Sequence, residues 1–459
     1  KSSGTLNLTF TLDGSKLAGK TLVAFEKCYL AKQEIAAHED LGDVKQTVQL
    51  PDIGTTLSDK ETGSHTAKAQ EITTLVDRVT YENLIPGKKY MMQGILMDAA
   101  TGEALLIDGE PVTSELTFTP EKASGVVELT FSFDASLLSG ESVVAFETCS
   151  QDGKVLAIHH DIKDENQTVH FPVIKTELTD SVSGFHISDA DKELQLTDTV
   201  SYENLVPGEE YVMKGILMNQ ETKEPLLIDG EEVTAEQSFI PESADGTVDV
   251  TFSFDAQKAA GQTVVAYESC TYGENEIAFH KEIDDKEQTV WIPAIATELI
   301  DSATGAHQVQ SSDKMEFIDT VSYENLIPGR EYVMKGILMD KTTKEALKID
   351  GKEVTAECTF TPEKSSGQVE MHFSFAGNEL TNQTLVAFET CFYADSRIAG
   401  HEDIEDENQS IVVTVPPEVV PEQPKTGDKT PLAVIAGVLL LGSAFVVYAM
   451  KRRNKKTDR

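Results

Sequence analysis

A segment that recurs at one fixed interval constrains this chain more than any other feature. The four-residue run Val-Ala-Phe/Tyr-Glu occurs four times, and its glutamates are Glu26, Glu147, Glu268 and Glu389. Every step is 121 residues (147 − 26 = 268 − 147 = 389 − 268 = 121), with no insertion between copies. Solenoid repeats have periods of roughly 20–50 residues. A longer fixed period indicates tandem domains that each fold as a unit.

The period also sets the domain boundaries that we expect. Lys1–Gly4 aligns with residues 122–125, so the chain is expected to begin inside a repeat whose front part, with any head domain, lies before residue 1. A repeat of 121 residues fits one domain with a single core. The predicted divisions are a partial repeat at 1–50, full repeats at 51–172, 173–293 and 294–415, a proline-rich stalk at 416–422, a sorting motif at 423–428, a transmembrane helix at 431–450 and a basic cytoplasmic tail at 451–459.

Strand patterns dominate each repeat. Val127, Leu129, Phe131 and Phe133 alternate with polar residues, turn pairs such as Pro207-Gly208 separate the segments, and no long helical period occurs before residue 431. Many short strands within about 120 residues are typical of an antiparallel β-sandwich. We therefore predict an all-β chain of tandem β-sandwich domains with a C-terminal transmembrane helix.

The net charge and the cysteine content limit the classes of function and cross-link that this chain can have. The formal net charge of −40 argues against a nucleic-acid partner, because binding phosphates needs clustered cations. Four of the five cysteines recur once per period, and only Cys358 shares a repeat with another, Cys391. The four recurring cysteines are interpreted as buried free thiols, Cys28, Cys149, Cys270 and Cys391. We expect no cofactor and no metal site.

Five polar residues recur at positions that should face the core. Thr176 lies between Ile174 and Leu178 in an alternating strand, and Asp198 shares its face with Val200. A histidine and a glutamine follow each glutamate at fixed spacing. A buried polar group without a partner costs on the order of 1–3 kcal/mol, so these side chains must satisfy one another.

These residue types also permit a reaction. A threonine hydroxyl is a weak nucleophile that needs a base such as histidine. A glutamine amide can be attacked and release ammonia, and two adjacent buried carboxyls keep one proton that can stabilise the oxyanion. The product is a threonine–glutamine ester. A buried hydrogen-bond network without a covalent bond remains the alternative.

The pattern Val-Ala-Phe-Glu, with a histidine eight residues before a glutamine and an upstream Asp-x-Val-x-Tyr-x-Asn-Leu-x-Pro-Gly, resembles the T-Q ester-bond domain, or VaFE repeat. Those domains are immunoglobulin-like stalk modules of Gram-positive surface adhesins, and the resemblance covers residues 1–415. It implies cross-links Thr55–Gln167, Thr176–Gln288 and Thr297–Gln409, with His159, His280 and His401 as bases and the acid pairs Asp77–Glu147, Asp198–Glu268 and Asp319–Glu389.

The first repeat departs from this pattern. Its Glu26, His38 and Gln46 have no threonine and aspartate partners in the chain, so we expect no bond and poor folding there. A further recurring set of aspartates is interpreted as turn formers, with calcium ligands as the alternative: Asp43, Asp164, Asp285 and Asp406.

Rival chemistries remain open. A lysine–asparagine isopeptide would use Lys175 and Asn166, but neither residue recurs at 121. A thioester would use Cys149. A hydrolase would use Thr176, His280 and Asp198 in an open cleft. Ligand binding by the repeats themselves would need exposed aromatic patches.

The C-terminal segment predicts where in the cell the protein is located. The pentapeptide Gln423-Pro424-Lys425-Thr426-Gly427, an apolar span and a basic tail resemble the LPXTG sorting signal, although Gln423 stands in the leucine position. The resemblance implies that sortase cuts between Thr426 and Gly427 and joins Thr426 to peptidoglycan. A permanent membrane anchor is the alternative. We therefore expect a wall-anchored, non-enzymatic adhesin or fimbria-like stalk, which passes the membrane before sorting and displays a head for an unknown host ligand.

Overall fold

The computed structural model describes residues 3–415, and the predicted stalk, sorting motif, transmembrane helix and tail lie outside them. Within these residues the regular secondary structure is β-strand apart from three short 3-10 helices, which confirms the predicted all-β class. No helix in the described part is long and apolar enough to cross a membrane.

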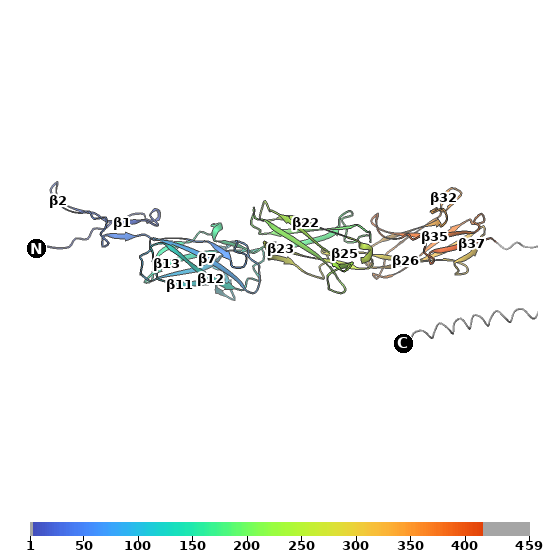
Figure 1. The fold of residues 1–459 in the computed structure, drawn as a ribbon, viewed down its shortest axis with the longest axis horizontal. Coiled ribbons are helices and arrows are strands. Elements are labelled where there is room, and N and C mark those ends of the chain that lie inside the picture. Colours follow the sequence, from blue (N-terminus) through green and yellow to red (C-terminus); the bar gives the residue numbers. More distant parts are fainter. Residues whose placement is uncertain (1–2, 416–459) are drawn as a thin grey trace, which may run out of the picture. The chain divides into compact units, whose positions relative to one another are not determined.

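Each full repeat consists of two antiparallel sheets around one core (Figure 1). In the third repeat the smaller sheet has the order β16-β17-β22 and the larger β21-β18-β23-β24, with β25 also pairing with β23. The elements are β16 (Val173–Asp180), β17 (Leu194–Glu203), β18 (Tyr211–Asn219), the hairpin β19 (Leu227–Ile228) and β20 (Glu231–Glu232), β21 (Thr234–Phe239), β22 (Gly246–Phe254), the 3-10 helix η3 (Ala256–Ala259), β23 (Thr263–Tyr272), β24 (Asn275–His280) and β25 (Thr289–Trp291).

The second repeat has the same plan with its first strand interrupted beside the predicted cross-linking threonine. Its smaller sheet joins β12, β7 and β5, and β6 also pairs with β7. The elements are β5 (Asp52–Gly54), β6 (Leu57–Asp59), β7 (Thr73–Glu82), β8 (Tyr90–Asp98), β9 (Leu106–Ile107), β10 (Glu110–Pro111), β11 (Thr113–Phe118), β12 (Gly125–Phe133), β13 (Ser142–Gln151), β14 (Lys154–His159), the 3-10 helix η2 (Glu165–Gln167) and β15 (Thr168–His170).

The fourth repeat adds a parallel pairing between β27 and β37 at the edge of its larger sheet. Its elements are β26 (Ala294–Asp301), β27 (Gln308–Gln310), β28 (Met315–Glu324), β29 (Tyr332–Asp340), β30 (Glu345–Ala346), β31 (Lys348–Ile349), β32 (Lys352–Glu353), β33 (Thr355–Phe360), β34 (Gly367–Phe375), β35 (Gln383–Tyr393), β36 (Ser396–His401) and β37 (Ser410–Thr414).

The alternation seen in the sequence places one face of each strand in the core. Along β17, Leu194, Leu196, Asp198, Val200 and Tyr202 are all buried, and the residues between them are less so. Apolar side chains of both sheets form one cluster in each full repeat. The aspartate is thus a polar residue in an otherwise apolar stripe.

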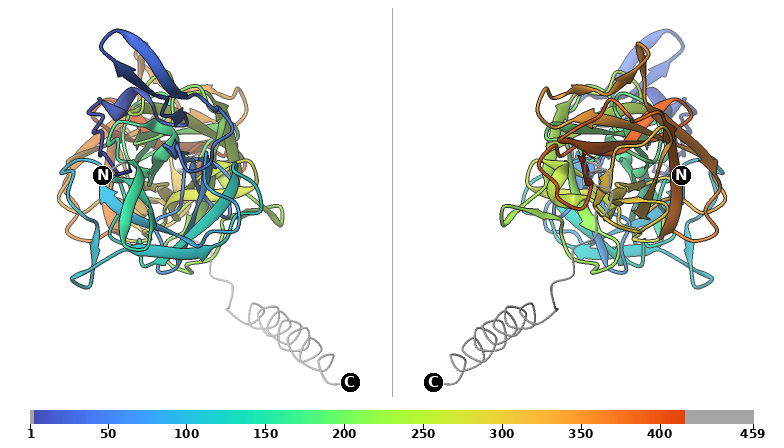
Figure 2. Two further views of the ribbon diagram at one scale, coloured as in Figure 1. Left: turned by 90° about the vertical axis from the view of Figure 1, so that its left-hand side faces the viewer. Right: turned by 90° about the vertical axis from the view of Figure 1, so that its right-hand side faces the viewer.

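The partial repeat has no comparable core. It contains the 3-10 helix η1 (Gly14–Lys16) and two pairs of strands, β1 (Thr21–Val23) with β4 (Thr47–Gln49) and β2 (Glu26–Leu30) with β3 (Gln33–His38). None of its described side chains is buried, and Figure 2 shows the dark blue hairpin standing clear of the other strands. Two-stranded sheets alone are marginally stable in water, so the prediction of poor folding fits this arrangement.

Consecutive repeats are joined by an asparagine whose role the sequence did not suggest. Asn204 has a φ of 66° and follows β17. Its side-chain amide donates to the Glu141 carbonyl at 2.7 Å, and its oxygen accepts from Ser142 at 3.1 Å, both in the preceding repeat. Asn83 and Asn325 occupy the same position in the other two full repeats and bond the Lys20 and Gln262 carbonyls.

Candidate functional site

The five recurring polar residues of each full repeat meet between its two sheets. In the third repeat, Thr176 and Asp198 project from β16 and β17 of the smaller sheet. Glu268 and His280 are paired neighbours on β23 and β24 of the larger sheet, and Gln288 directly precedes β25. The threonine, aspartate, glutamate and glutamine are buried. We call these five positions the cross-link site.

The glutamine is held by a turn that directly precedes the last strand of the larger sheet. In the second repeat Gln167 ends the 3-10 helix η2, which Asp164 caps by accepting a hydrogen bond from the Asn166 N–H. In the third repeat the Ala266 N–H donates to the Gln288 carbonyl, which anchors the backbone beside β23. The short turn therefore aims the amide into the core.

Hydrogen bonds connect the cross-link site in two halves. Thr55 donates its hydroxyl to Asp77, and the Gln167 amide donates to Glu147 at 2.6 Å and to the Ala145 carbonyl at 2.7 Å. The threonine–aspartate and glutamine–glutamate contacts recur in the other full repeats. They are Thr176 to Asp198, Gln288 to Glu268 at 2.7 Å, Thr297 to Asp319 at 2.5 Å and Gln409 to Glu389 at 2.5 Å.

The two halves touch in the fourth repeat. There the Gln409 amide nitrogen lies 3.4 Å from the Thr297 hydroxyl oxygen, although the residues are 112 apart in sequence. The carbon that bears this nitrogen is the atom that a hydroxyl would attack.

The carboxyls of the cross-link site form a pair that retains a proton. Burial, and then the charge of Asp77, raise the pKa of Glu147 to about 10. Burial also raises the pKa of Asp77, against hydrogen bonds from Thr55 and Glu147 that lower it. Asp77 Oδ2 and Glu147 Oε1 are both enclosed and have no conventional donor among the described residues. One proton shared between them satisfies both oxygens, with the protonated form favoured on the glutamate.

The other full repeats have the same electrostatics. Burial and Asp319 raise the pKa of Glu389 to about 10, and burial raises the pKa of Glu268 well above its ordinary value. The side-chain oxygens of the three glutamines are enclosed and accept no hydrogen bond within the part of the chain described. An amide oxygen without a donor can accept one from an acid as negative charge develops on it.

The histidine contacts an aspartate that the sequence analysis interpreted only as a turn former. His159 Nε2 lies 3.0 Å from Asp164 Oδ2, and its Nδ1 lies 3.3 Å from the Ile53 carbonyl. The other oxygen of Asp164 accepts from the backbone of the turn. The histidine–aspartate distance is 3.0 Å for His280–Asp285 and His401–Asp406 and 2.9 Å for His38–Asp43. The recurrence of these aspartates at 121 residues was the only sign in the sequence that they matter. Their contact with the histidines is seen only in the fold.

No hydrogen bond joins histidine to threonine in the described cross-link sites. The two nitrogens of His159 lie beside oxygens of other residues, Nε2 near the Asp164 carboxylate and Nδ1 near the Ile53 carbonyl. The charge of His159 lowers the pKa of Asp77 and so favours the ionised aspartate. The group in contact with the Thr55 hydroxyl is that aspartate, so the histidine's role as base stays a prediction.

The rival residues lie elsewhere. Cys149, Cys270 and Cys391 are buried free thiols, as predicted, whereas Cys28 in the partial repeat is exposed. Burial raises the pKa of Cys149 to about 11, which disfavours the thiolate that a thioester would need. Lys175 is an exposed side chain that contacts Glu203, and Asn166 is also exposed.

The partial repeat keeps three members of the site. Gln46 donates to Glu26, and His38 contacts Asp43. The same glutamine–glutamate and histidine–aspartate contacts occur in the full repeats.

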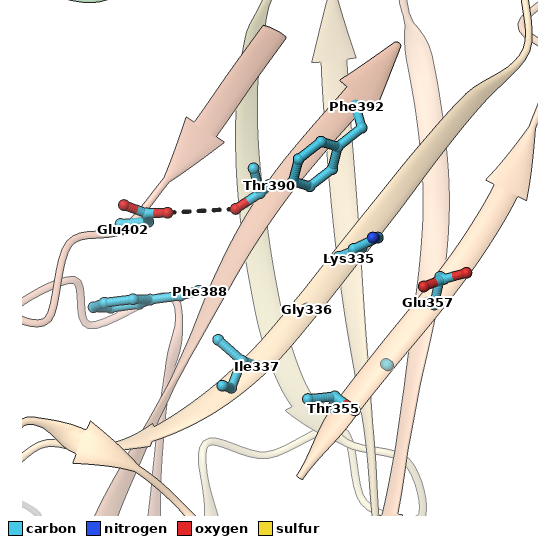
Figure 3. Close-up of a pocket in the computed structure, with 10 residues that line it drawn as sticks. Lys335, Gly336, Ile337, Thr355, Glu357, Phe388, Thr390, Phe392 and Glu402 are labelled. Atoms are coloured by element: carbon cyan, nitrogen blue, oxygen red, sulfur yellow. Dashed lines mark hydrogen bonds between the residues drawn. The ribbon is translucent and has the colours of Figure 1, made fainter. Parts of the chain in front are cut away.

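A surface hollow of the fourth repeat is separate from the cross-link site. It lies over Gly336, between Lys335, Phe388 and Thr390, on the outer face of β29 and β35 (Figure 3). Glu389 of the same strand is fully buried on the opposite face. Thr390 contacts Glu402 at 3.3 Å across this hollow, and none of the five residues lines it.

The chain shows distant similarity to several solved structures of other proteins. The chain resembles two structures of one bacterial adhesin from Mobiluncus mulieris containing intramolecular disulfide, isopeptide and ester bond cross-links. The identities are 12% and 11%, the TM-score is 0.24 for both, and the matches cover 55% and 56% of this chain and 88% and 91% of those chains. An Escherichia coli alpha-2-macroglobulin matches at 13% identity and a TM-score of 0.18, over 83% of this chain and 37% of that one. Scores this low carry no argument about arrangement.

No curated protein sequence matches the chain. The family model of the T-Q ester bond containing domain matches four times, at residues 1–50, 51–171, 172–292 and 293–413. These matches span nearly all of the described residues. The chain therefore belongs to the family of T-Q ester bond containing domains.

Proposed function

We propose that each full repeat forms one intramolecular ester between its threonine and its glutamine, without turnover of any other substrate. The observation that carries this proposal is the meeting of a threonine hydroxyl and a glutamine amide beside a buried carboxyl pair. In the fourth repeat the hydroxyl oxygen and the amide nitrogen are 3.4 Å apart. The expected bonds are Thr55–Gln167, Thr176–Gln288 and Thr297–Gln409.

The reaction balances within the cross-link site. The Thr297 oxygen attacks the Gln409 amide carbon, and the hydroxyl proton moves to Asp319, its hydrogen-bond partner. The carbon–nitrogen bond breaks, and the nitrogen leaves as ammonia with a proton supplied by Glu389, its own partner. Asp319 then passes the proton that it gained to Glu389, which returns both carboxyls to their starting protonation states. No oxidant or cofactor is required.

The proposed bond ties the two sheets of a sandwich together. Thr176 belongs to the smaller sheet, and Gln288 adjoins the strand that pairs with the larger one. The cross-link closes a loop of 112 residues (288 − 176 = 112). Water is excluded at a buried site, which protects an ester from hydrolysis.

A row of such domains suits a surface stalk. Gln167 and Thr176 are 9 residues apart (176 − 167 = 9), and 9 residues extend to at most ~30 Å. Load passing along the chain would thus cross an ester, a short connector and the next ester. We propose a stalk of a Gram-positive adhesin or fimbria-like protein, joined by sortase to peptidoglycan through Thr426, that carries a binding head.

Intact mass spectrometry of the full chain tests the cross-link. The wild-type chain should be lighter than its sequence mass by three ammonia molecules. Thr176→Ala should restore one of them, whereas Thr199→Ala, an exposed threonine on β17, should restore none. A wild-type mass equal to the sequence mass overturns the proposal.

A further inference from the structure

Three potential metal ligands converge on the surface of the third repeat. Glu177 lies on β16, His186 in the segment between β16 and β17, and Glu287 immediately before Gln288. One ligand atom from each of the three lies within 4.8 Å of the other two. The two glutamates are exposed, while the histidine is half-buried. This cluster is separate from the five residues of the cross-link site.

The spacing of the cluster fits a shared ion better than direct hydrogen bonds. His186 Nε2 lies 3.8 Å from the Glu177 carboxylate and 3.9 Å from the Glu287 carboxylate. Both distances exceed a hydrogen bond. Ligands about 2.0–2.2 Å from a tetrahedral zinc ion are roughly 3.4 Å apart, close to these separations. Small side-chain rotations would bring all three atoms to one centre.

The backbone holds the three positions in place. The Leu178 N–H donates to the Glu287 carbonyl at 2.8 Å, which joins the segments carrying the two glutamates. The Trp291 N–H donates to the His186 carbonyl at 2.9 Å, and the Ser188 N–H returns a bond to Trp291 at 2.9 Å. His186 Nδ1 is enclosed and has no partner within residues 3–415, whereas Nε2 is the nitrogen that faces the two glutamates.

We propose that Glu177, His186 and Glu287 bind one divalent transition-metal ion of the zinc type, with water completing the coordination. A neutral imidazole favours such an ion over calcium or magnesium, which prefer oxygen ligands. The strongly negative chain attracts cations to its surface. The sequence analysis predicted no metal site, because these residues are separated along the chain.

The site would clamp the same strands as the proposed ester. Glu177 follows Thr176, and Glu287 precedes Gln288, the two residues of the third cross-link. A metal bound outside would hold β16 against the segment before β25 whether or not the ester forms. The inference therefore does not rest on the proposed function.

The other repeats supply natural controls. The fourth repeat has Glu298 and His307, 3.9 Å apart, but Asn408 stands where Glu287 would align (287 + 121 = 408). The second repeat retains only His65, whose Nδ1 contacts the Thr168 carbonyl at 2.9 Å. We thus expect one such site in the chain, and one substitution should create a second.

Calorimetric titration of ZnCl₂ into the metal-free full chain tests the proposal. The wild type should bind one zinc ion at this site. His186→Ala and Glu287→Asn should each weaken that binding by more than about tenfold. The matched variant His307→Ala should leave it unchanged. Asn408→Glu should add a second site of similar affinity, and removing the proposed ester with Thr176→Ala should leave zinc binding in place.

Glu287→Asn guards against misfolding as an explanation, because asparagine occurs at this position in both neighbouring repeats. Equal binding by wild type, His186→Ala and Glu287→Asn overturns the proposal. Equal loss in His186→Ala and His307→Ala also overturns it, since that result assigns zinc to scattered surface groups. Calcium binding that survives His186→Ala, without zinc binding, rejects the zinc-type assignment.

Discussion

At the residue scale, the proposed cross-linking reaction depends on two buried carboxyls that share one proton. The Asp319 carboxylate accepts the threonine hydroxyl, and Glu389 contacts the glutamine amide that must leave. Because the aspartate contacts the threonine and the glutamate contacts the glutamine, the two carboxyls have different proposed roles. The pair therefore combines a base and an acid within one hydrogen-bonded unit.

Replacing the acid should abolish one bond at a time. Glu268→Gln keeps the size of the side chain but removes the proton donor beside Gln288. We expect a mass deficit of two ammonia molecules instead of three, measured on the intact chain. Glu232→Gln, at an exposed position on β20, should keep all three. Three losses in Glu268→Gln would contradict the assigned acid.

The raised pKa of Glu389 predicts how stability depends on pH when the bond is absent. In Thr297→Ala the carboxyl pair remains, and the folded repeat holds a proton that unfolding releases above the ordinary value of 4.5. Rising pH therefore favours unfolding, and stability should fall steadily from about pH 5 toward the folded pKa of about 10.

Hydrogen exchange of the strands of the fourth repeat across this range measures the effect. Adding Glu389→Gln to Thr297→Ala removes the titrating group, so the slope should flatten. Stability of Thr297→Ala that rises between about pH 5 and about pH 9 would contradict the protonated state of this carboxyl.

At the scale of elements, the two sheets pack closely because one strand of the larger sheet has a glycine at a position where any side chain would clash with the smaller sheet. A Cβ on Gly215 of β18 would lie 2.5 Å from the Phe252 ring of β22. Gly94 and Gly336 meet Phe131 and Phe373 in the same way. This contact brings the sheets together near the strand that carries the glutamate, because Gly215 pairs with Glu268.

Gly215→Ala should therefore destabilise the third repeat by roughly 1–3 kcal/mol through overpacking. Urea unfolding of a chain with Thr176→Ala, which lacks the bond in that repeat, reveals the loss most directly. Lys214→Ala, at the adjacent exposed position, is the matched control. Equal stability of Gly215→Ala and Lys214→Ala would show that the sheets tolerate a wider separation.

The asparagine between repeats belongs to the same scale. Asn204→Gly keeps a backbone that accepts positive φ but removes the bonds to Glu141 and Ser142. We expect it to weaken the junction by about 1 kcal/mol, seen as faster hydrogen exchange around β15 and the start of β16. Asn204→Ala should weaken it further, since alanine is also strained at that φ.

At the scale of the whole molecule, the proposed cross-links decide how the chain responds to force. A folded domain without its ester can be pulled out along its full length, whereas an ester between Thr176 and Gln288 keeps 112 residues (288 − 176) out of the load path. The chain-entropy account of a closed loop of about 100 residues adds about 4.7 kcal/mol of stability.

Single-molecule pulling on the full chain measures this response. Thr176→Ala should add one unfolding step that releases roughly 370–400 Å of contour before the folded length is subtracted. The wild type should show no step of that length from any full repeat. The exposed substitution Thr199→Ala should behave like the wild type. Full-length steps in the wild type would show that the stalk is extensible.

Much of this protein could be predicted from local pattern. The 121-residue period defined the repeats, and the alternation around Thr176 and Asp198 predicted strands with polar residues facing inward. Those features follow from strand geometry, because every second side chain shares a face. The burial of the cysteines followed from the same pattern in the full repeats, and failed at Cys28, where no second sheet covers the strand.

Only the tertiary structure decided which of these residues touch. Packing two sheets against each other brought the Gln409 amide nitrogen within 3.4 Å of the Thr297 hydroxyl, 112 residues away in sequence. It also brought Glu177, His186 and Glu287 together, and set Asn204 against the preceding repeat. Contacts of this kind join segments far apart in the chain. Their partners depend on how two faces meet in space, which no periodicity within a single strand specifies.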